Sequence, residues 1–322
     1  MGIGVEDIRR FEKRGQVISS KITSLLPDIK FDLVEMDIVS IDQGKDIAKK
    51  NWKEALKVFG AIYSDNSRTN EERVEGAIQA SQMLVNLGRL KQADGILDGS
   101  LRLLSKISDE KAVLLLSAGI LEKRAWVADY KGKSKNAITF LNKSKEIYDS
   151  FGLDLPLENE DSKSTVEHFL GRSNFSLGHI DQAILHFESD LARYVSLSEK
   201  GEPRPGGEAF NNAWLARCYI HKNESEKAHE YLDKTFNLFM EEGKLNNDEA
   251  AMAHYYLVNS EIALIEGNPT EAVVSAKKAL EISATKEPIY IKGGIDAILV
   301  LSIAYWQIGK SYIYSGSSNT SS

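Results

Sequence analysis

The feature that most constrains the fold of this chain is a unit that recurs along it at nearly constant intervals. The clearest copy is LGRSNFSLGHIDQAILHFESDL, residues 170–191, in which Gly178 separates two amphipathic stretches. Ala183, Phe187 and Leu191 then follow one helical turn apart on one face. A small residue at Ala183 lets the second stretch, as a helix, pack closely against the first, and the larger side chains fill the seam.

The same order of residues recurs at regular steps along the sequence. The small residue is an alanine every time: Ala55, Ala93, Ala137, Ala183, Ala228 and Ala272. The intervals between these alanines are 38, 44, 46, 45 and 44 residues. A period of this length predicts an all-α array in which each unit is a pair of antiparallel helices, here named the A helix and the B helix.

The units resemble tetratricopeptide (TPR) repeats. Residues 170–191 match the pattern of that family at Leu170, Gly171, Gly178, Ala183, Phe187 and Leu191. Tyr219 and Tyr305 supply the family's aromatic residue in two later units, although the unit around Tyr219 lacks glycines. The standard family repeat has about 34 residues, so the longer units here are similar to the long-helix variants in signal-sensing regulators and in the arms of signalling ATPases. The resemblance implies a right-handed superhelical solenoid.

The domain organisation follows from the repeat. We expect an N-terminal helix and linker in residues 1–33, six to seven helix pairs in residues 34–313 and a flexible tail in residues 314–322. The expected helices are 4–25, 34–48, 52–64, 69–87, 90–106, 109–130, 134–151, 163–177, 180–197, 207–222, 225–242, 247–266, 270–284 and 289–308. Two links are long: the acidic segment 151–164, expected to be a flexible loop, and segment 199–209, a candidate part of a ligand site.

Composition excludes several classes of protein. A net charge of −7, from 47 acidic and 40 basic side chains, argues against a nucleic-acid binder. The sequence shows neither a signal peptide nor an apolar run of membrane-spanning length. The single cysteine, Cys218, allows no intramolecular disulfide. We therefore expect a cytoplasmic protein that binds neither nucleic acid nor membrane.

The sequence contains none of the common catalytic or phosphate-binding motifs. Its six histidines do not form pairs with metal-ligand spacing. Cys218 lies within an expected helix, which favours a packing role over a nucleophilic one. We therefore expect no enzyme activity, cofactor or metal.

The stacked A helices offer a surface for binding, because they line the concave face of such a superhelix. When the A helices are aligned by the repeat period, a set of polar and aromatic side chains is predicted to lie on this face: Gln82, Trp126, His168, Arg172, Asn211, Asn212, Arg217 and His221. Arginine pairs with carboxylates and asparagine with peptide backbone, so this face suits an acidic or extended peptide. The competing interpretation is that these side chains only bridge neighbouring helices.

The tryptophans divide between two roles. Trp52 and Trp214 lie at packing positions, whereas Trp126 and Trp306 are candidates for exposed anchors.

Two functions remain open. One is a non-catalytic scaffold or sensor that holds a protein or peptide on its concave face. The other is the C-terminal sensor arm of a larger signalling ATPase or transcription regulator.

Overall fold

The structure is a computed structural model that describes residues 40–199, 201, 204–240, 249–285 and 296–308. These residues are helical and contain no β-strand. The helices are α2 (Ile41–Ala48), α3 (Trp52–Ser64), α4 (Asn70–Asn86), α5 (Leu90–Leu104), α6 (Glu110–Tyr130), α7 (Ser134–Phe151), α8 (Leu157–Ser176), α9 (Ile180–Glu199), α10 (Pro205–His221), α11 (Ser225–Met240), α12 (Glu249–Ile265), α13 (Pro269–Thr285) and a last helix at 296–308. The expected N-terminal helix and the tail lie outside the described residues.

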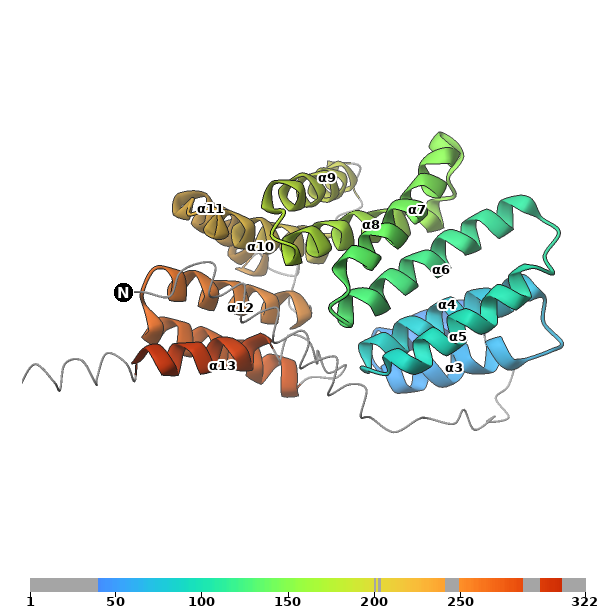
Figure 1. The fold of residues 1–322 in the computed structure, drawn as a ribbon, viewed down its shortest axis with the longest axis horizontal. Helices are drawn as coiled ribbons and strands as arrows, with labels where there is room; N and C mark the ends of the chain where they lie inside the picture. The colour runs from blue at the N-terminus through green and yellow to red at the C-terminus, as the bar shows by residue number, and fades with distance from the viewer. Residues whose placement is uncertain (1–39, 200, 202–203, 241–248, 286–295, 309–322) are drawn as a thin grey trace, which may run out of the picture. The chain divides into compact units, whose positions relative to one another are not determined.

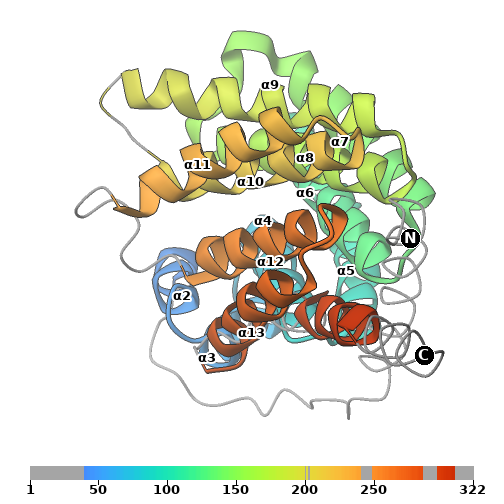
Figure 2. The ribbon, with the colours of Figure 1, turned by 90° about the vertical axis from the view of Figure 1, so that its left-hand side faces the viewer.

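The described residues divide into two compact units, 40–177 and 178–308, here called the first and second unit. Within the first unit α4 pairs with α5 and α6 with α7, and within the second α10 pairs with α11 and α12 with α13 (Figures 1 and 2). This arrangement confirms the predicted all-α array of consecutive helix pairs.

The helices begin where the sequence supplies capping side chains. The Thr69 hydroxyl accepts a hydrogen bond from the Glu72 amide, and the Glu72 side chain accepts one from the Thr69 amide. Asn51 and Asp109 cap α3 and α6 in a similar way through their side-chain oxygens. Each cap satisfies amide groups that have no partner inside the helix.

In the five helix pairs from α4 to α13, the turn from the A helix to its B helix passes through one residue with a left-handed backbone, here called the turn residue. The turn residues are Gly88, Gly132, Gly178, Asn223 and Gly267, with φ between 62° and 81°. Asn223 takes this place in the unit without glycine, because asparagine tolerates positive φ better than most residues. The amide after the turn closes the helix end: Arg89 donates to the Leu84 carbonyl at 2.7 Å.

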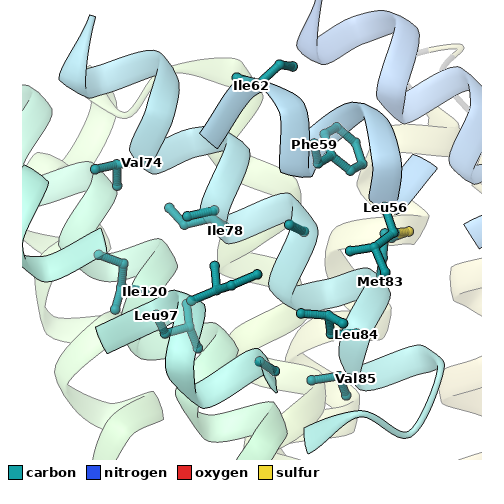
Figure 3. Packing of buried hydrophobic residues seen from close by; sticks show 14 of the residues in the cluster. Leu56, Phe59, Ile62, Val74, Ile78, Met83, Leu84, Val85, Leu97 and Ile120 are labelled. Carbon is teal, nitrogen blue, oxygen red and sulfur yellow. The ribbon is translucent and has the colours of Figure 1, made fainter. Parts of the chain in front are cut away.

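Small residues allow the helices to approach closely. All six repeat alanines are fully buried, as their predicted role in the seams requires. Figure 3 shows the core of the first unit, where Phe59 and Ile62 of α3 pack on α4. A Cβ on Gly76 would lie 2.9 Å from Ile62 Cγ2 and 3.1 Å from the Phe59 carbonyl oxygen, so α4 needs a glycine there.

The expected flexible loop at 151–164 is wrong. The segment forms a 3₁₀ turn, Gly152–Asp154, and α8 already begins at Leu157. Pro156 stands at the helix start with φ −59°, and the acidic residues that follow it favour the positive end of the helix dipole. The negative charge that suggested a loop instead stabilises a helix N-terminus.

The second long link is also shorter than expected, because α10 starts at Pro205. Proline is tolerated in the first helical turn, where no intrahelical amide donor is lost. Gly207 then allows α10 to meet α9, since a Cβ there would lie 2.3 Å from Tyr194 Cζ.

Candidate partner-binding site

The predicted surface residues lie on A helices, in two groups that belong to different units. Gln82 is on α4, Trp126 on α6, and His168 and Arg172 on α8, all in the first unit. The other four, Asn211, Asn212, Arg217 and His221, lie on α10 in the second unit. Each group is therefore described within its own unit.

In the first unit, aromatic rings and cations alternate in what we call the α6–α8 cluster. Its members are Glu122, Lys123, Trp126, Asp129 and Tyr130 of α6, and His168, Phe169 and Arg172 of α8. The Trp126 and Phe169 rings stack with centroids 4.4 Å apart. Lys123 Nζ lies 4.2 Å from the Trp126 centroid, and Arg172 Cζ lies 4.5 Å from that of Phe169. Both faces of the stacked pair thus carry a cation, the arrangement that the ring quadrupole favours.

Each of these cations is also paired with a carboxylate. Arg172 Nη2 donates to Asp129 Oδ2 at 2.8 Å, and Lys123 Nζ donates to Glu122 Oε1 at 2.6 Å. All four side chains are buried. Burial raises the pKa of Glu122, because the loss of hydration outweighs the attraction of Lys123.

Three predicted residues in the first unit are only half-buried: Gln82, Trp126 and His168. The Trp126 indole Nε1 is itself buried and has no hydrogen-bond acceptor among the described residues. His168 meets the edge of the Phe169 ring, with centroids 5.9 Å apart. Trp126 was expected to be an exposed anchor, but Phe169 and Lys123 cover part of its ring.

In the second unit a corresponding α9–α12 cluster surrounds Arg217. Its members are Phe187 and Asp190 of α9, Phe210, Asn211, Trp214 and Arg217 of α10, and His254 and Glu261 of α12. Arg217 Nε and Nη2 donate to the two carboxylate oxygens of Glu261, each at 2.6 Å. This bidentate pair is buried, with side-chain exposures of 6% and 2%. Arg217 Cζ also lies 4.9 Å from the Trp214 centroid.

Aromatic contacts complete this second cluster. Trp214 stacks on Phe187 at 5.3 Å and meets His254 at 5.0 Å, and His254 stacks on Phe210 at 5.0 Å. Trp214 is 6% exposed, which confirms its predicted packing role.

The remaining polar residues of α10 are buried as well. Asn211 Nδ2 donates to Asp190 Oδ2 at 2.8 Å, and Asn212 and His221 are each 3% exposed. Cys218 is fully buried, and burial raises the pKa of its thiol. These side chains thus hold α10 in place rather than project from it.

The two ion pairs share one register position. Asp129, Arg172, Arg217 and Glu261 follow one another at intervals of 43, 45 and 44 residues, which is the repeat period. The repeat pattern predicted the two arginines as surface residues but not their partners. Opposite charges one repeat apart on neighbouring A helices were the signal that could have identified Asp129 and Glu261.

No group of three or more His, Cys, Asp or Glu side chains in the described part of the chain is placed to hold a metal ion. No helix within the described ranges is long and apolar enough to cross a membrane.

Comparison with known proteins identifies the fold of this chain. Neither a protein-family model nor a curated protein sequence matches this chain. Among solved structures, BtubC from P. vanneervenii is 14% identical at a TM-score of 0.50, covering 85% of this chain and 91% of that one. A signal transduction ATPase with numerous domains (STAND) from Pyrococcus horikoshii, which has a tetratricopeptide repeat sensor, is 19% identical at a TM-score of 0.51. That match covers 85% of this chain and 41% of the ATPase. These similarities confirm a TPR-like helical repeat fold.

Proposed function

We propose that the protein is a non-catalytic scaffold or sensor module that binds a protein or peptide through the surface of its A helices. The TPR-like fold supports this proposal, since such arrays present extended surfaces rather than enclosed reaction sites. The proposal includes a cytoplasmic location and no role for nucleic acid, membrane, metal or cofactor.

The observation that carries the proposal is the indole N–H of Trp126. A buried donor without an acceptor is unfavourable by roughly 1–3 kcal/mol, and a partner that supplies a carbonyl oxygen removes this penalty. Trp126, Gln82 and His168 are all half-buried, so a partner can contact part of each side chain in the folded unit; it reaches the buried Nε1 only when a neighbouring side chain moves aside. An extended segment that offers a backbone carbonyl to Trp126 fits these side chains.

The buried members of the α6–α8 cluster support this surface within the first unit, and those of the α9–α12 cluster hold the A helices of the second unit together. Arg172 and Arg217 are already bonded to Asp129 and Glu261. An acidic side chain of a partner would have to displace one of these carboxylates to reach a guanidinium group. We therefore assign direct contact to the half-buried residues, and assign positioning to the two arginines together with Asn211, Asn212 and His221.

The experiment that tests this proposal separates the N–H of Trp126 from its ring. A photo-crosslinker beside Gln82 would capture the partner in native lysate for wild type, Trp126→Phe and Trp126→Ala. The partner bound by wild type should be captured roughly 10-fold less by Trp126→Phe, as expected for a lost hydrogen bond. Trp126→Ala should lose it entirely, because the stack on Phe169 is lost too.

Trp306→Phe is the matched control, since Trp306 is a tryptophan of the other unit and is 51% exposed. Thermal unfolding of each variant checks that the fold is kept. Equal capture by wild type and Trp126→Phe would exclude the indole N–H as a binding group.

A second function, a sensor arm of a larger signalling ATPase, is favoured by one observation. This chain matches 41% of a STAND protein that has a TPR sensor. Immunoblotting of native lysate tests it: a band far above 35.8 kDa supports the arm. A band at that mass supports the free-standing scaffold.

A further inference from the structure

The seam between the A and B helices of a pair is built from fixed positions. Seven residues before the turn residue, the A helix carries a small, fully buried residue in the pairs α4–α5, α6–α7, α10–α11 and α12–α13: Ser81, Ala125, Ala216 and Ser260. Four residues before the turn residue it carries a second buried residue: Leu84, Ala128, Tyr219 and Ala263. We call these two places the seam positions.

The B helix covers the seam positions with a matching pattern. Five residues after the turn it carries a fully buried alanine, and nine residues after the turn an apolar residue. In the pair α4–α5, Leu84, Ala93 and Leu97 belong to one core. In the pair α10–α11, Tyr219 stacks on Tyr231 with centroids 5.4 Å apart. A seam position is thus buried because a B helix lies on it.

The last described helix, residues 296–308, carries the same seam without a cover. Gly309 follows Gly267 by 42 residues in the sequence, so Ser302 and Tyr305 occupy the seam positions. Both are exposed, Tyr305 by 51%, and Ile298, one turn earlier on this face, is 52% exposed.

The opposite face of the same helix is packed. The last helix is the red one in Figures 1 and 2. Its residues Val300, Ile303 and Ala304 are buried in one core with Ala272 and Ala276 of α13. The helix is therefore fixed on the unit, with its seam face open.

The sequence that follows this helix does not carry the pattern of a B helix. Five and nine residues after Gly309 stand Tyr314 and Ser318, where the other pairs have alanine and an apolar residue. A bulky residue in the place of the alanine would keep two helices apart. Residues 310–322 therefore lack the pattern that covers the other seams.

We propose that the face formed by Ile298, Ser302 and Tyr305 binds an amphipathic α-helix of a partner protein. The partner helix carries an alanine followed four positions later by leucine or phenylalanine, the pattern that covers the other seams. Lys277 Nζ lies 5.9 Å from the Tyr305 centroid and gives the face a basic edge. Acidic residues beside that alanine complement this edge.

A peptide of this protein's own α11, residues 225–240, is the probe for this face. Its A helix has Tyr219 where the last helix has Tyr305, and it carries Ala228 and Leu232 among side chains of both charges, with Glu226 and Glu230 two positions from the alanine on either side. Fluorescence anisotropy of the labelled peptide with the full chain should show saturable binding. Tyr305→Ala and Ser302→Arg should each weaken it at least about 10-fold, as hot-spot changes do.

Two controls make the result specific. Leu185→Ala removes an apolar side chain that is 57% exposed on α9 and should leave binding unchanged. A peptide with Ala228→Arg should not bind, because the long side chain holds the helices apart. Circular dichroism of the protein variants checks that helix content is kept.

Four outcomes would overturn the proposal. The first is no saturable binding at millimolar peptide, and the second is binding that Ser302→Arg leaves intact. The third is a dimer in sedimentation that Ser302→Arg dissociates, because a second copy of the chain would then be the occupant. Peptide binding that requires deletion of residues 309–322 would likewise assign the face to the tail.

Discussion

The two units contain the same buried ion pair in opposite order along the chain. In the first unit the carboxylate, Asp129, precedes the arginine, Arg172, and in the second Arg217 precedes Glu261. The first pair has one hydrogen bond of 2.8 Å and an arginine side chain that is 11% exposed. The second has two bonds of 2.6 Å and an arginine side chain that is 6% exposed.

This difference shows what the repeat specifies. A period near 44 residues sets side chains of neighbouring A helices beside one another, whichever of them carries the positive charge. Along the chain the four charges are negative, positive, positive and negative, so one ion pair forms within each unit. The repeat fixes the position of the pair, and the individual residues fix its strength.

The largest expected effect comes from breaking the stronger pair. Arg217→Ala leaves Glu261 buried without its cation, and should lower the free energy of unfolding of the second unit by about 4 kcal/mol. Urea unfolding followed by circular dichroism measures this change. The double variant Arg217→Leu/Glu261→Leu should recover most of the loss, and a double variant as unstable as the single one would contradict the assignment.

Breaking the weaker pair should have a smaller effect. Arg172→Ala removes the hydrogen bond to Asp129 and the contacts with Phe169 and Tyr130, and should cost about 2 kcal/mol in the first unit. The same urea experiment compares it directly with Arg217→Ala. If Arg172→Ala lowers the free energy of unfolding more than Arg217→Ala does, hydrogen-bond geometry and burial do not decide which ion pair is the stronger.

The turn residues of the two units, a glycine and an asparagine, can each be replaced by the other. The first unit turns through Gly132, with φ 69°, and the second through Asn223, with φ 62°. Gly132→Asn should lower stability by about 1 kcal/mol, and Asn223→Gly should raise it by up to about 1 kcal/mol, since glycine adopts this backbone with less strain. Thermal melts of both variants test the exchange. If both variants shift the melting temperature in the same direction, the left-handed backbone does not decide whether glycine or asparagine is the more stable turn residue.

The smallest expected effect concerns pH and the first unit. Burial raises the pKa of Glu122 in the folded state above its unfolded value. The stability that protonated Glu122 contributes is therefore complete below the unfolded pKa and is lost as the pH rises through the folded pKa. Between pH 7 and pH 5, wild type should gain stability relative to Glu122→Gln. A difference between the two that does not vary with pH would contradict the raised pKa.

The fold was predictable because its signals are local and repeated. An alanine marked each helix pair and a turn glycine marked four of them, and the predicted ranges 52–64 and 134–151 coincide with α3 and α7. The helix start at Leu157 was missed because acidic residues were interpreted as loop, although they also stabilise a helix N-terminus.

The candidate site was less predictable, because its contacts depend on neighbours one repeat away. The sequence placed Trp126, His168 and Arg172 on one surface, but it did not show that Arg172 turns back to Asp129. The burial of Asn211 and Arg217 depends on α9 and α12, which lie outside their own helix. Trp306 shows the opposite case: it was expected to be an exposed anchor, and it is 51% exposed.

The Asp129–Arg172 pair also determines which parts of the first unit open together. In repeat proteins, stability is the sum of the stability of each repeat and of the contacts between neighbours. This pair belongs to the second kind, since it joins α6 to α8. Amide protons in these two helices should therefore exchange with solvent in one cooperative event, whereas those at the outer turns of α2 exchange earlier.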